Sequence, residues 1–514
     1  MVDDAQAREG DEPQSVGAWC PEAECFREVG RAHGTKEVDE VAGNARRVDG
    51  GTECGKEEIR PAADGRAQDR KTVRAVLERI GERARKEKKE RFTNLLSHIK
   101  VPLLKEAYES LRKDAAAGVD GKTWSDYGEN LEARLLDLQD RIQRGGYRPP
   151  PVRRVHIPKG DGKQVRPIGI PAVEDKIAQQ AVRMLLEPIY EGDFLGFSYG
   201  FRPGRNQHQA LDALYVALQR KVNWVIDADI QSFFDTIDHG WMERFIEHRI
   251  GDRRLVKLLM KWLRAGVMED GRLREVYQGT PQGGCISPLM ANVYLHYVID
   301  VWARQWRQRQ AKGQMYIVRF ADDLVMGFER EQDALAMHSA LVERLAKFGL
   351  ELHTEKTRVI RFGRFAHEHC AKEGHRRPET FDFLGFTHIC AKGPDGRFRL
   401  VRRTSRRKRA AKTRALRQEL RKRRHDPVPD QHRWLRSVLR GHTNYYGVPG
   451  NSRALASFRN EIRDAWHRQL QRRSQRARWS KQKHDRFDVK FPIPSLHIAH
   501  PYPPARFYAR RTRP

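Results

Sequence analysis

The sequence predicts an α+β protein in which an antiparallel sheet is backed by helices, followed by a region that is all helix. Between about 149 and 395, β-type runs alternate with stretches whose apolar residues recur at helical spacing. Beyond about 401 only the helical spacing continues. These two observations predict a sheet-and-helix body with a helical C-terminal part.

The elements are expected in a definite order along the chain. Residues 1–70 are rich in Gly, Ala, Glu and Asp without periodicity, so we expect a disordered acidic extension. Helices are expected over residues 71–150. A hairpin is expected at 149–171, where two β-type runs flank the polar turn "KGDGK". Further strands are expected at "NWVIDAD", "MYIVRFADDLVMGF", "ELHTEKTRVIRFG" and "FDFLGFTHICA", with helices between them.

The composition excludes several classes of protein. Hydrophobic residues make up 39% and charged residues 32% of the 514, which suits a soluble globular protein. No apolar run approaches the roughly 20 residues of a membrane span, so no membrane partner is expected. The N-terminal stretch lacks the basic and apolar regions of a secretory signal. None of the six cysteines forms a CxxC pair, which argues against a zinc ribbon or disulfide framework and favours a reducing cytoplasm.

The net charge of +30 is unevenly distributed. Residues 1–66 carry 9 Lys/Arg against 16 Asp/Glu, whereas residues 401–514 carry 32 Lys/Arg against 7 Asp/Glu. Arginine dominates the C-terminal excess, and its planar fork suits phosphate groups. A solvated basic face or a disordered tail would also be basic. Because apolar periodicity and aromatic residues accompany the charge, we expect a nucleic-acid backbone as the partner.

Two adjacent aspartates, Asp322 and Asp323, lie between two apolar β-type runs. They could form a plain hairpin turn, since Asp is common in turns. Asp229 ends another apolar run, "VIDAD", and would face the same space if its strand neighbours the hairpin. Clustered carboxylates of this kind are stable when they share protons or bind cations, and hard oxygen ligands suit Mg²⁺. Two such ions are the device for in-line phosphoryl transfer.

The motifs around these aspartates resemble those of the group II intron-encoded reverse transcriptase/maturase family. The resemblance runs from roughly Leu95 to the C-terminus, and seven motifs occur in the family's order. They are "RPIGIPAVEDKIAQQAV", "FSYGFRPGRNQHQAL", "VIDADIQSFFDTIDH", "QGTPQGGCISPLMANVYLHYVID", "VRFADDLVMGF", "LELHTEKTRVIRFG" and "FDFLGFTH". The resemblance implies a right-hand polymerase, with the helical N-terminal part of the fingers at 71–150, fingers and palm at 151–398, a helical thumb/X domain at 399–475 and a basic tail at 476–514 that contacts DNA or RNA.

The resemblance also implies roles for individual residues. Asp229, Asp322 and Asp323 match the catalytic aspartates, and Ile230 would offer its backbone carbonyl to Mg²⁺. Asp227 shares a face with Asp229, but the motif selects Asp229. The expected nucleotide-binding residues are Lys159, Arg166, Phe234 and Gln282. The expected nucleic-acid-binding residues are Arg202, Arg205, Lys356, Asn444, Tyr445 and Tyr446.

Several of these assignments have an alternative. Lys159 and Arg166 could belong to a solvated basic hairpin, on which Lys163 is equally basic. Phe234, which should exclude a ribose 2′-OH, could be ordinary core. Arg202 and Arg205 could lie in a basic surface loop. At least one of the two tyrosines could pack between helices.

One position departs from the family, because Phe320 stands where a tyrosine is usual. This change could alter positioning of the primer terminus.

The resemblance implies RNA-directed DNA synthesis from dNTPs on an RNA template with a DNA primer or target. It also implies binding of the parent group II intron RNA, which would promote splicing and intron mobility in the bacterial cytoplasm, with association to the nucleoid on DNA. Two alternatives stay open: a freestanding relative recruited to DNA repair or phage defence, and an RNA-binding maturase without polymerase activity. An RNA-dependent RNA polymerase is disfavoured by Phe234.

Overall fold

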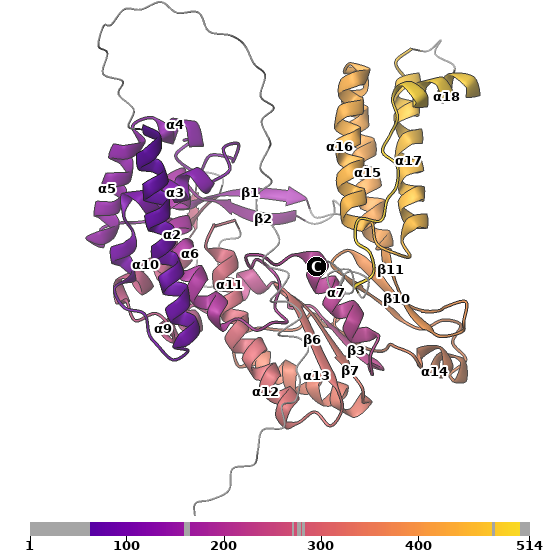
Figure 1. Cartoon of the computed structure of the whole chain (residues 1–514), viewed down its shortest axis with the longest axis horizontal. Helices are drawn as coiled ribbons and strands as arrows, with labels where there is room; N and C mark the ends of the chain where they lie inside the picture. Colours follow the sequence, from indigo (N-terminus) through magenta and orange to yellow (C-terminus); the bar gives the residue numbers. More distant parts are fainter. Residues whose placement is uncertain are drawn as a thin grey trace, which may run out of the picture. The chain divides into compact units, whose positions relative to one another are not determined.

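The computed structural model describes residues 62–158, 165–269, 272–274, 279, 283–474 and 479–503 (Figure 1). All of them belong to one compact unit, Ile59–Pro514. Within these ranges, no helix is both long enough and apolar enough to cross a membrane.

The chain begins with a helical layer. It contains α2 (Ala62–Lys86), η2 (Leu95–His98), α3 (Val101–Ser110), α4 (Trp124–Gly128), α5 (Leu131–Gln143) and α6 (Val173–Asp193). α2 packs along α6, and the small residues Ala84 and Gly192 permit a close approach, since a Cβ on Gly192 would lie 3.6 Å from that of Ala84. The expectation of disorder up to residue 70 is wrong for 62–70, because the helix already begins at Ala62. Residues 1–61 lie outside the described part.

The expected hairpin at 149–171 is confirmed. β1 (Val152–Pro158) pairs antiparallel with β2 (Val165–Ile170), with Ile157 opposite Arg166. The sheet continues through β4 (Val267–Glu269), which runs parallel to β1, and β5 (Arg272–Arg274), in the order β2-β1-β4-β5.

The central sheet has the order β6-β7-β3-β8, and all its pairings are antiparallel. Its strands are β3 (Trp224–Ala228), β6 (Met315–Phe320), β7 (Asp323–Phe328) and β8 (Arg358–Arg361). Both faces are buried. α13 (Glu331–Ala346) contacts β3, β7 and β8, while α7 (Gln207–Leu218) contacts β6 and β7. Alternate residues of β3 therefore enter two different hydrophobic cores, Ile226 in one and Val225 in the other.

Further helices surround this sheet. They are α8 (Phe233–Thr236), α9 (His239–Glu247), α10 (Arg253–Leu263), α11 (Ser287–Leu295), the π-helix η3 (His296–Asp300) and α12 (Val301–Arg309). α11, η3 and α12 follow one another without a break, so the π-helix is a local widening inside one long helical rod (Figure 1).

A third sheet follows α14 (Ala366–Lys372). It consists of β9 (Thr380–Phe383), β10 (Phe386–Lys392) and β11 (Phe398–Thr404), in the order β11-β10-β9. The stretch expected as strand at "FDFLGFTHICA" is divided by a turn at Leu384 and Gly385, which have φ of 47° and 81°. β11 crosses the boundary expected at 398, so the helical region starts later than the sequence predicted.

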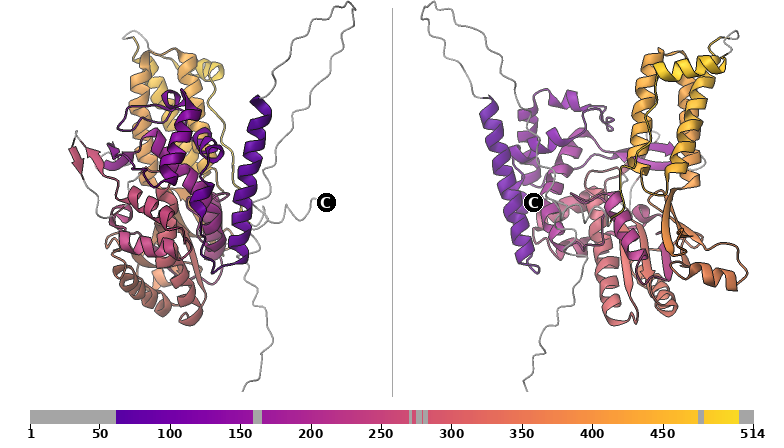
Figure 2. Two further views of the ribbon diagram at one scale, coloured as in Figure 1. Left: turned by 90° about the vertical axis from the view of Figure 1, so that its left-hand side faces the viewer. Right: turned by 45° about the vertical axis from the view of Figure 1, so that its right-hand side comes forward.

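The C-terminal region is helical and has its own core. Its helices are α15 (Arg406–Lys422), η4 (Arg423–His425), α16 (Val428–Tyr446), α17 (Ser452–Gln471) and α18 (Lys481–Lys490). α17 contacts both α15 and α16, and the three run side by side in Figure 2. The core between them contains the apolar residues Leu416, Leu420, Leu435, Leu439, Ile462 and Trp466.

An extended segment, residues 491–503, ends the described chain. Its Pro494 carbonyl accepts a hydrogen bond from Arg459 Nε of α17 at 2.9 Å, and His500 N donates to the Gly447 carbonyl at 2.9 Å. The ring of Tyr502 lies 5.8 Å from that of Tyr215 on α7. This segment therefore connects the C-terminal helices to α7.

Candidate active site

The paired aspartates lie at a tight turn between β6 and β7. Phe320 pairs with Asp323, which leaves only Ala321 and Asp322 to form the turn. Ala321 has φ 56°, a left-handed conformation that a residue with a side chain rarely adopts. The turn therefore needs support from its surroundings to keep this shape.

The third aspartate lies at the same end of the sheet. β3 runs antiparallel beside β7 with Ala228 opposite Leu324, so Asp229 follows β3 where Asp323 begins β7. Its backbone is fixed: the Asp229 carbonyl accepts from His353 N at 2.8 Å, and its N–H donates to Thr357 Oγ1 at 3.3 Å. The condition attached to the sequence hypothesis, that the strand of Asp229 neighbours the hairpin, is thereby met.

Negative charge accumulates at this end of the sheet. Loss of solvating water within the surrounding protein, together with the charges of Asp322 and Asp229, raises the pKa of the Asp323 carboxyl to about 7, while Lys408 and Lys356 oppose the rise. Asp323 is open to solvent, so water screens part of this effect. Burial raises the pKa of Asp227 to about 7 as well, against Arg358 and with help from Asp323 and Asp229.

Lys356 lies directly on the site. Its Nζ is 2.5 Å from Asp229 Oδ2, and the two side chains are 57% and 28% exposed. The expected contact of Lys356 with nucleic acid is therefore replaced, in this conformation, by an ion pair with Asp229. Among the described residues, no group of three or more His, Cys, Asp or Glu side chains converges closely enough to hold a metal ion.

Phe234 lies four residues beyond Ile230, at the start of the helical region after β3. It is half-buried and meets Phe233 edge-on at 5.3 Å between ring centroids. Gly279, from the glycine-rich loop, lies against its backbone, since a Cβ on Gly279 would lie 2.7 Å from the Phe234 carbonyl oxygen. The backbone of this loop thus approaches Phe234 as closely as glycine permits.

Only some of the other expected nucleotide contacts lie among the described residues. Lys159 and Gln282 lie outside the described residues, as does the alternative Lys163. Arg166 is placed on β2 by its pairing with Ile157. Gly283, next to Gln282, packs on the same strand, since its Cβ would lie 2.4 Å from the Gly169 carbonyl oxygen.

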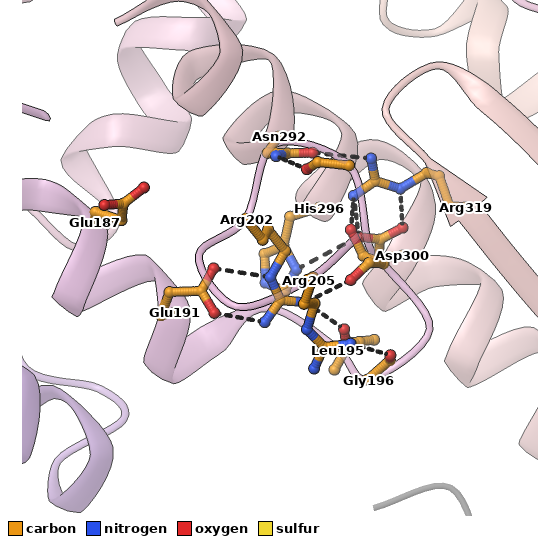
Figure 3. A network of polar contacts seen from close by, with 12 residues as sticks. Glu187, Glu191, Leu195, Gly196, Arg202, Arg205, Asn292, His296, Asp300 and Arg319 are labelled. Atoms are coloured by element: carbon orange, nitrogen blue, oxygen red, sulfur yellow. Dashed lines mark hydrogen bonds and ion pairs between the residues drawn. The ribbon is translucent and has the colours of Figure 1, made fainter. Parts of the chain in front are cut away.

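The expected template contact at Arg202 is wrong. Its side chain is 3% exposed and forms a bidentate ion pair with Glu191 at 2.8 and 2.9 Å. It also donates to the carbonyls of Leu195 and Ser198 (Figure 3). Arg205 is partly buried, donates to the Gly196 carbonyl at 2.6 Å and lies over the Tyr199 ring. Arg202 therefore holds the loop that was expected to bind template.

The tyrosines of the "GHTNYYGV" motif pack inside the protein. Tyr445 donates its hydroxyl to the Leu384 carbonyl at 2.9 Å, and both rings lie on Phe386, at 5.9 and 5.1 Å. The packing interpretation is therefore correct, and stacking of these rings on nucleic acid is not supported. Asn444 is exposed, with its carbonyl bonded to His500 Nε2 at 2.8 Å.

The sequence interpretation missed the residues that support the turn. Arg319, in β6, is completely buried and makes an ion pair with Asp300 of η3, which is completely buried too (Figure 3). Asn292 of α11 contacts the same guanidinium. The only sequence signal was one charged residue within an otherwise apolar stretch of strand, "YIVRF".

A basic groove lies between α15 and α17. Its volume is about 900 Å³. Seven arginines line it: Arg406, Arg409, Arg414, Arg417, Arg421, Arg468 and Arg472. Among the lining residues the acidic one is Glu461, whose carboxylate lies 3.8 Å from Arg409. The groove is thus a positively charged surface on two helices that pack around the hydrophobic core of the C-terminal region.

Replacing Asp227 with Asn should stabilise the protein at pH 8 in the absence of divalent cations. A pKa raised from 3.8 to about 7 means that the fold favours the protonated carboxyl, so its stabilising contribution is lost as the pH rises through about 7. We expect Asp227→Asn to raise the free energy of unfolding at pH 8 by about 1–2 kcal/mol, after allowance for solvent screening. The gap should close near pH 4. Chemical denaturation in EDTA at both pH values measures it.

Asp485→Asn is the matched control for this measurement, because Asp485 is exposed on α18. Its effect on stability should be the same at both pH values. A gap for Asp227→Asn that does not change with pH would contradict the raised pKa.

The chain is similar to known proteins in the region of this site. Residues 157–388 match the reverse transcriptase (RNA-dependent DNA polymerase) family. Over 183 residues the chain is 43% identical to protein YkfC of Escherichia coli strain K12, covering 35% of this chain and 48% of YkfC. Over 290 residues it is 34% identical to the group II intron-encoded protein LtrA of Lactococcus lactis subsp. cremoris, covering 56% of this chain and 44% of LtrA.

An intron protein of yeast is a third relative. The putative COX1/OXI3 intron 2 protein of Saccharomyces cerevisiae is 33% identical over 214 residues, covering 40% of this chain and 24% of that protein. The chain thus spans about half the length of YkfC and LtrA. The family match at 157–388 includes Asp229, Asp322 and Asp323. The region around the three aspartates is therefore similar to reverse transcriptases, and stretches of 290 and 214 residues are similar to intron-encoded proteins.

Proposed function

We propose that the protein is an RNA-directed DNA polymerase that also binds its parent group II intron RNA and promotes splicing and mobility of that intron. The observation that carries the proposal is the strand pairing that brings Asp229, Asp322 and Asp323 to one end of the central sheet, inside the region matching reverse transcriptases. Adjacent carboxylates at a strand end are costly unless they serve a charge-dependent task.

The proposed architecture is that of a right hand. The central sheet with α7 and α13 would be the palm, and the β1–β2 hairpin with the N-terminal helices the fingers. α15, α16 and α17 would form the thumb/X domain. Support comes from the separate hydrophobic core of these three helices, which is what a distinct module requires.

The three carboxylates have the oxygen ligands that a hard divalent cation such as Mg²⁺ prefers, although in the described residues they do not converge closely enough to hold one without a rearrangement. Loss of solvation, together with repulsion from Asp322 and Asp229, raises the pKa of Asp323, and a cation would relieve the repulsion. Asp229, Asp322 and Asp323 would hold the ion, with the Ile230 carbonyl. Two hydrogen bonds flank the bridge between Ile230 and Leu352, and their acceptors are the carbonyls of Asp229 and Glu351. Neither of these two bonds uses the Ile230 carbonyl. When bound, such ions would lower the pKa of an attacking 3′-hydroxyl and stabilise the leaving oxygen.

The chain's own residues would prepare this site. Lys356 lies on Asp229 and neutralises its charge, so it would have to turn aside before the carboxylate could take a cation. Its side chain is more than half exposed, which leaves room for that movement.

Nucleotide selection would come from the surroundings of Phe234. Its ring would lie beneath the sugar and collide with a ribose 2′-OH. Lys159 and Arg166 would hold the triphosphate and Gln282 the incoming base or template. Gly279 and Gly283 support this assignment for the loop, because both approach other backbone too closely for a Cβ.

RNA would bind the basic groove between α15 and α17. Its seven arginines and its location on one face of a helical module suit a phosphate backbone. Arg205, Lys356 and Asn444 remain candidates for further contacts, whereas Arg202, Tyr445 and Tyr446 are committed to internal contacts.

Replacing Asp322 with Asn should abolish DNA synthesis and leave RNA binding unchanged. The amide keeps the shape of the turn but removes one charge from the carboxylate cluster. Primer extension on an RNA template should fall by at least about 1000-fold, a size typical of losing essential charge stabilisation. RNA affinity, measured by filter binding, should stay within about threefold.

The control is Asp395→Asn, on the turn between β10 and β11, which should retain full synthesis. Undiminished synthesis by Asp322→Asn would contradict the site assignment. A wild-type protein that binds RNA but makes no DNA would indicate the maturase without polymerase activity.

Replacing Phe234 with Val should admit ribonucleotides. The smaller side chain removes the collision with the 2′-OH, so the preference in kcat/KM for dNTPs over NTPs should fall by about 10- to 100-fold. Single-nucleotide extension with each triphosphate measures it. Phe245→Val, a half-buried ring on α9, is the matched control and should leave the preference unchanged. An unchanged preference in Phe234→Val would return Phe234 to ordinary packing.

Removing arginines from the groove should weaken RNA binding in a salt-dependent way. For Arg417→Gln/Arg421→Gln, the slope of log affinity against log salt concentration should decrease by about 1 for each phosphate that the variant no longer neutralises. The matched control, Arg436→Gln/Arg440→Gln, has the same spacing on α16 outside the groove and should keep the wild-type slope. Equal slopes for both double variants would exclude the groove as the RNA site. Sequencing RNA that copurifies with the protein would separate a maturase devoted to one intron from a freestanding polymerase.

A further inference from the structure

We propose that Arg319 is a positioning residue for the catalytic turn, acting together with Asp300, Asn292 and Ser198. The proposal rests on the proposed function, because it assigns Arg319 the task of holding Asp322 and Asp323 in place for DNA synthesis. None of these four side chains touches substrate in this assignment. They act through the backbone of Ala321 and Gly200.

The guanidinium of Arg319 has an acceptor for each of its five N–H groups. Nε and Nη2 donate to the two carboxylate oxygens of Asp300 at 2.7 and 2.6 Å. Nη2 also donates to Ser198 Oγ at 2.8 Å, and Nη1 donates to Asn292 Oδ1 at 3.2 Å. The remaining Nη1 bond, at 2.8 Å, goes to the carbonyl of Ala321. An arginine offers five donors in a fixed fork, so this side chain has no freedom left.

The bond to Ala321 holds the turn from inside. Ala321 is the residue with φ 56°, and it stands between Arg319 and the aspartates in sequence. Without a glycine at this position, the left-handed conformation persists only where surrounding contacts impose it. The Arg319 side chain supplies one such contact, because it donates to the carbonyl of the residue two positions further along the chain.

The turn is also held from outside by Gly200. A Cβ on Gly200 would lie 2.3 Å from the Ala321 nitrogen, so the two backbones are in direct contact. The carbonyl of Gly200 accepts a hydrogen bond from Asn292 Nδ2 at 2.7 Å. Its neighbour Tyr199 donates its N–H to the Arg319 carbonyl at 2.9 Å. Asn292 thus joins the inner and outer supports, because it contacts both Arg319 and Gly200.

Asp300 comes from a π-helical segment and has Arg319 as its balancing cation. Asp300 is the last residue of the π-helix η3, which widens the rod between α11 and α12. π-helical segments of this kind are rare and often accompany functional sites. His296, one turn earlier, lies 4.0 Å from Asp300 Oδ2, and burial lowers its pKa to about 4. His296 is therefore neutral at pH 7, and Arg319 is the cation that balances Asp300.

Figure 3 shows that this group and the Arg202–Glu191 pair flank one loop. Arg202 donates to the Ser198 carbonyl at 2.7 Å while Arg319 donates to the Ser198 hydroxyl. The loop from Leu195 to Arg202 is thereby fastened at both ends, and Gly200 cannot retreat from the turn. Small displacements of catalytic groups lower rates strongly, so a fastened turn has a direct catalytic value.

The test uses three variants of graded severity in the full chain: Ser198→Ala, Asn292→Leu and Arg319→Lys. Arg319→Lys keeps the charge beside Asp300 but cannot reach Ala321 at the same time. We expect it to lower kcat for primer extension by about 100-fold. KM for dNTP and Kd for primer–template should stay within about threefold. Ser198→Ala removes one acceptor and should lower kcat by a smaller factor, with Asn292→Leu between the two.

A second readout does not depend on activity. Hydrogen exchange of the backbone amides at 320–324, measured by mass spectrometry without substrate, should accelerate in the same order as kcat falls. This arm tests the support of the turn even if the protein makes no DNA, so failure of the proposed function and failure of this inference are distinguishable.

Arg249→Lys is the matched control. Arg249 is also buried, forms an ion pair with Asp193 at 2.8 Å and donates to the backbone carbonyls of Ala84, Glu87, Lys88 and Glu90. It should lower the melting temperature as Arg319→Lys does, but leave kcat and exchange at 320–324 unchanged. The inference is overturned if folded Ser198→Ala and Asn292→Leu proteins show wild-type exchange at the turn, or if Arg249→Lys lowers kcat equally.

Discussion

The structure depends on one register, the pairing of β3 with β7 that sets Ala228 opposite Leu324. A slip by one residue would turn every side chain of β3 to the other face and carry Asp229 away from the hairpin. The register is secured because both faces of the sheet are buried, with Val225 and Ile226 entering different cores. Apolar packing therefore fixes the location of the charges, although it contributes no atom to the chemistry.

Two kinds of charged group bear on the site. Ion pairs with a buried arginine, such as Arg319–Asp300, Arg202–Glu191 and Arg249–Asp193, hold backbone segments. Removing one partner of such a pair typically costs about 3–5 kcal/mol, because the other charge is left buried. The carboxylates of Asp227 and Asp323 are different, since loss of solvation and neighbouring carboxylates raise their pKa values. Crowded carboxylates of this second kind are the ones that suggest chemistry.

Sequence reasoning located the site but not the residues that support it. Motif order identified Asp229, Asp322 and Asp323, and strand pairing places them at the same end of the central sheet. It failed for Arg202, because the sequence shows that an arginine is present but not that a glutamate eleven residues away accepts its donors.

It missed Arg319 for a similar reason. The partner Asp300 comes from a π-helix that no periodicity rule predicts. The start of α2 at Ala62 was also missed, since local composition outweighed a helix that is stabilised by packing on α6. The tyrosines at 445 and 446 could equally suit RNA or a core until Phe386 was placed beneath them.

The contact of Tyr445 and Tyr446 with the turn between β9 and β10 has an evolutionary consequence. Gly385 has φ 81°, and a Cβ there would lie 2.9 Å from the Tyr446 hydroxyl. A larger residue at position 385 would therefore press against the side chain of Tyr446. Recombination between related genes that exchanged the helices after β11 without Leu384 and Gly385 would break up this contact. A crossover upstream of Thr380 would transfer the complete unit, whereas one at 392–404 would separate the two sides of the contact. The unit that would be inherited intact therefore includes the third sheet as well as the C-terminal helices.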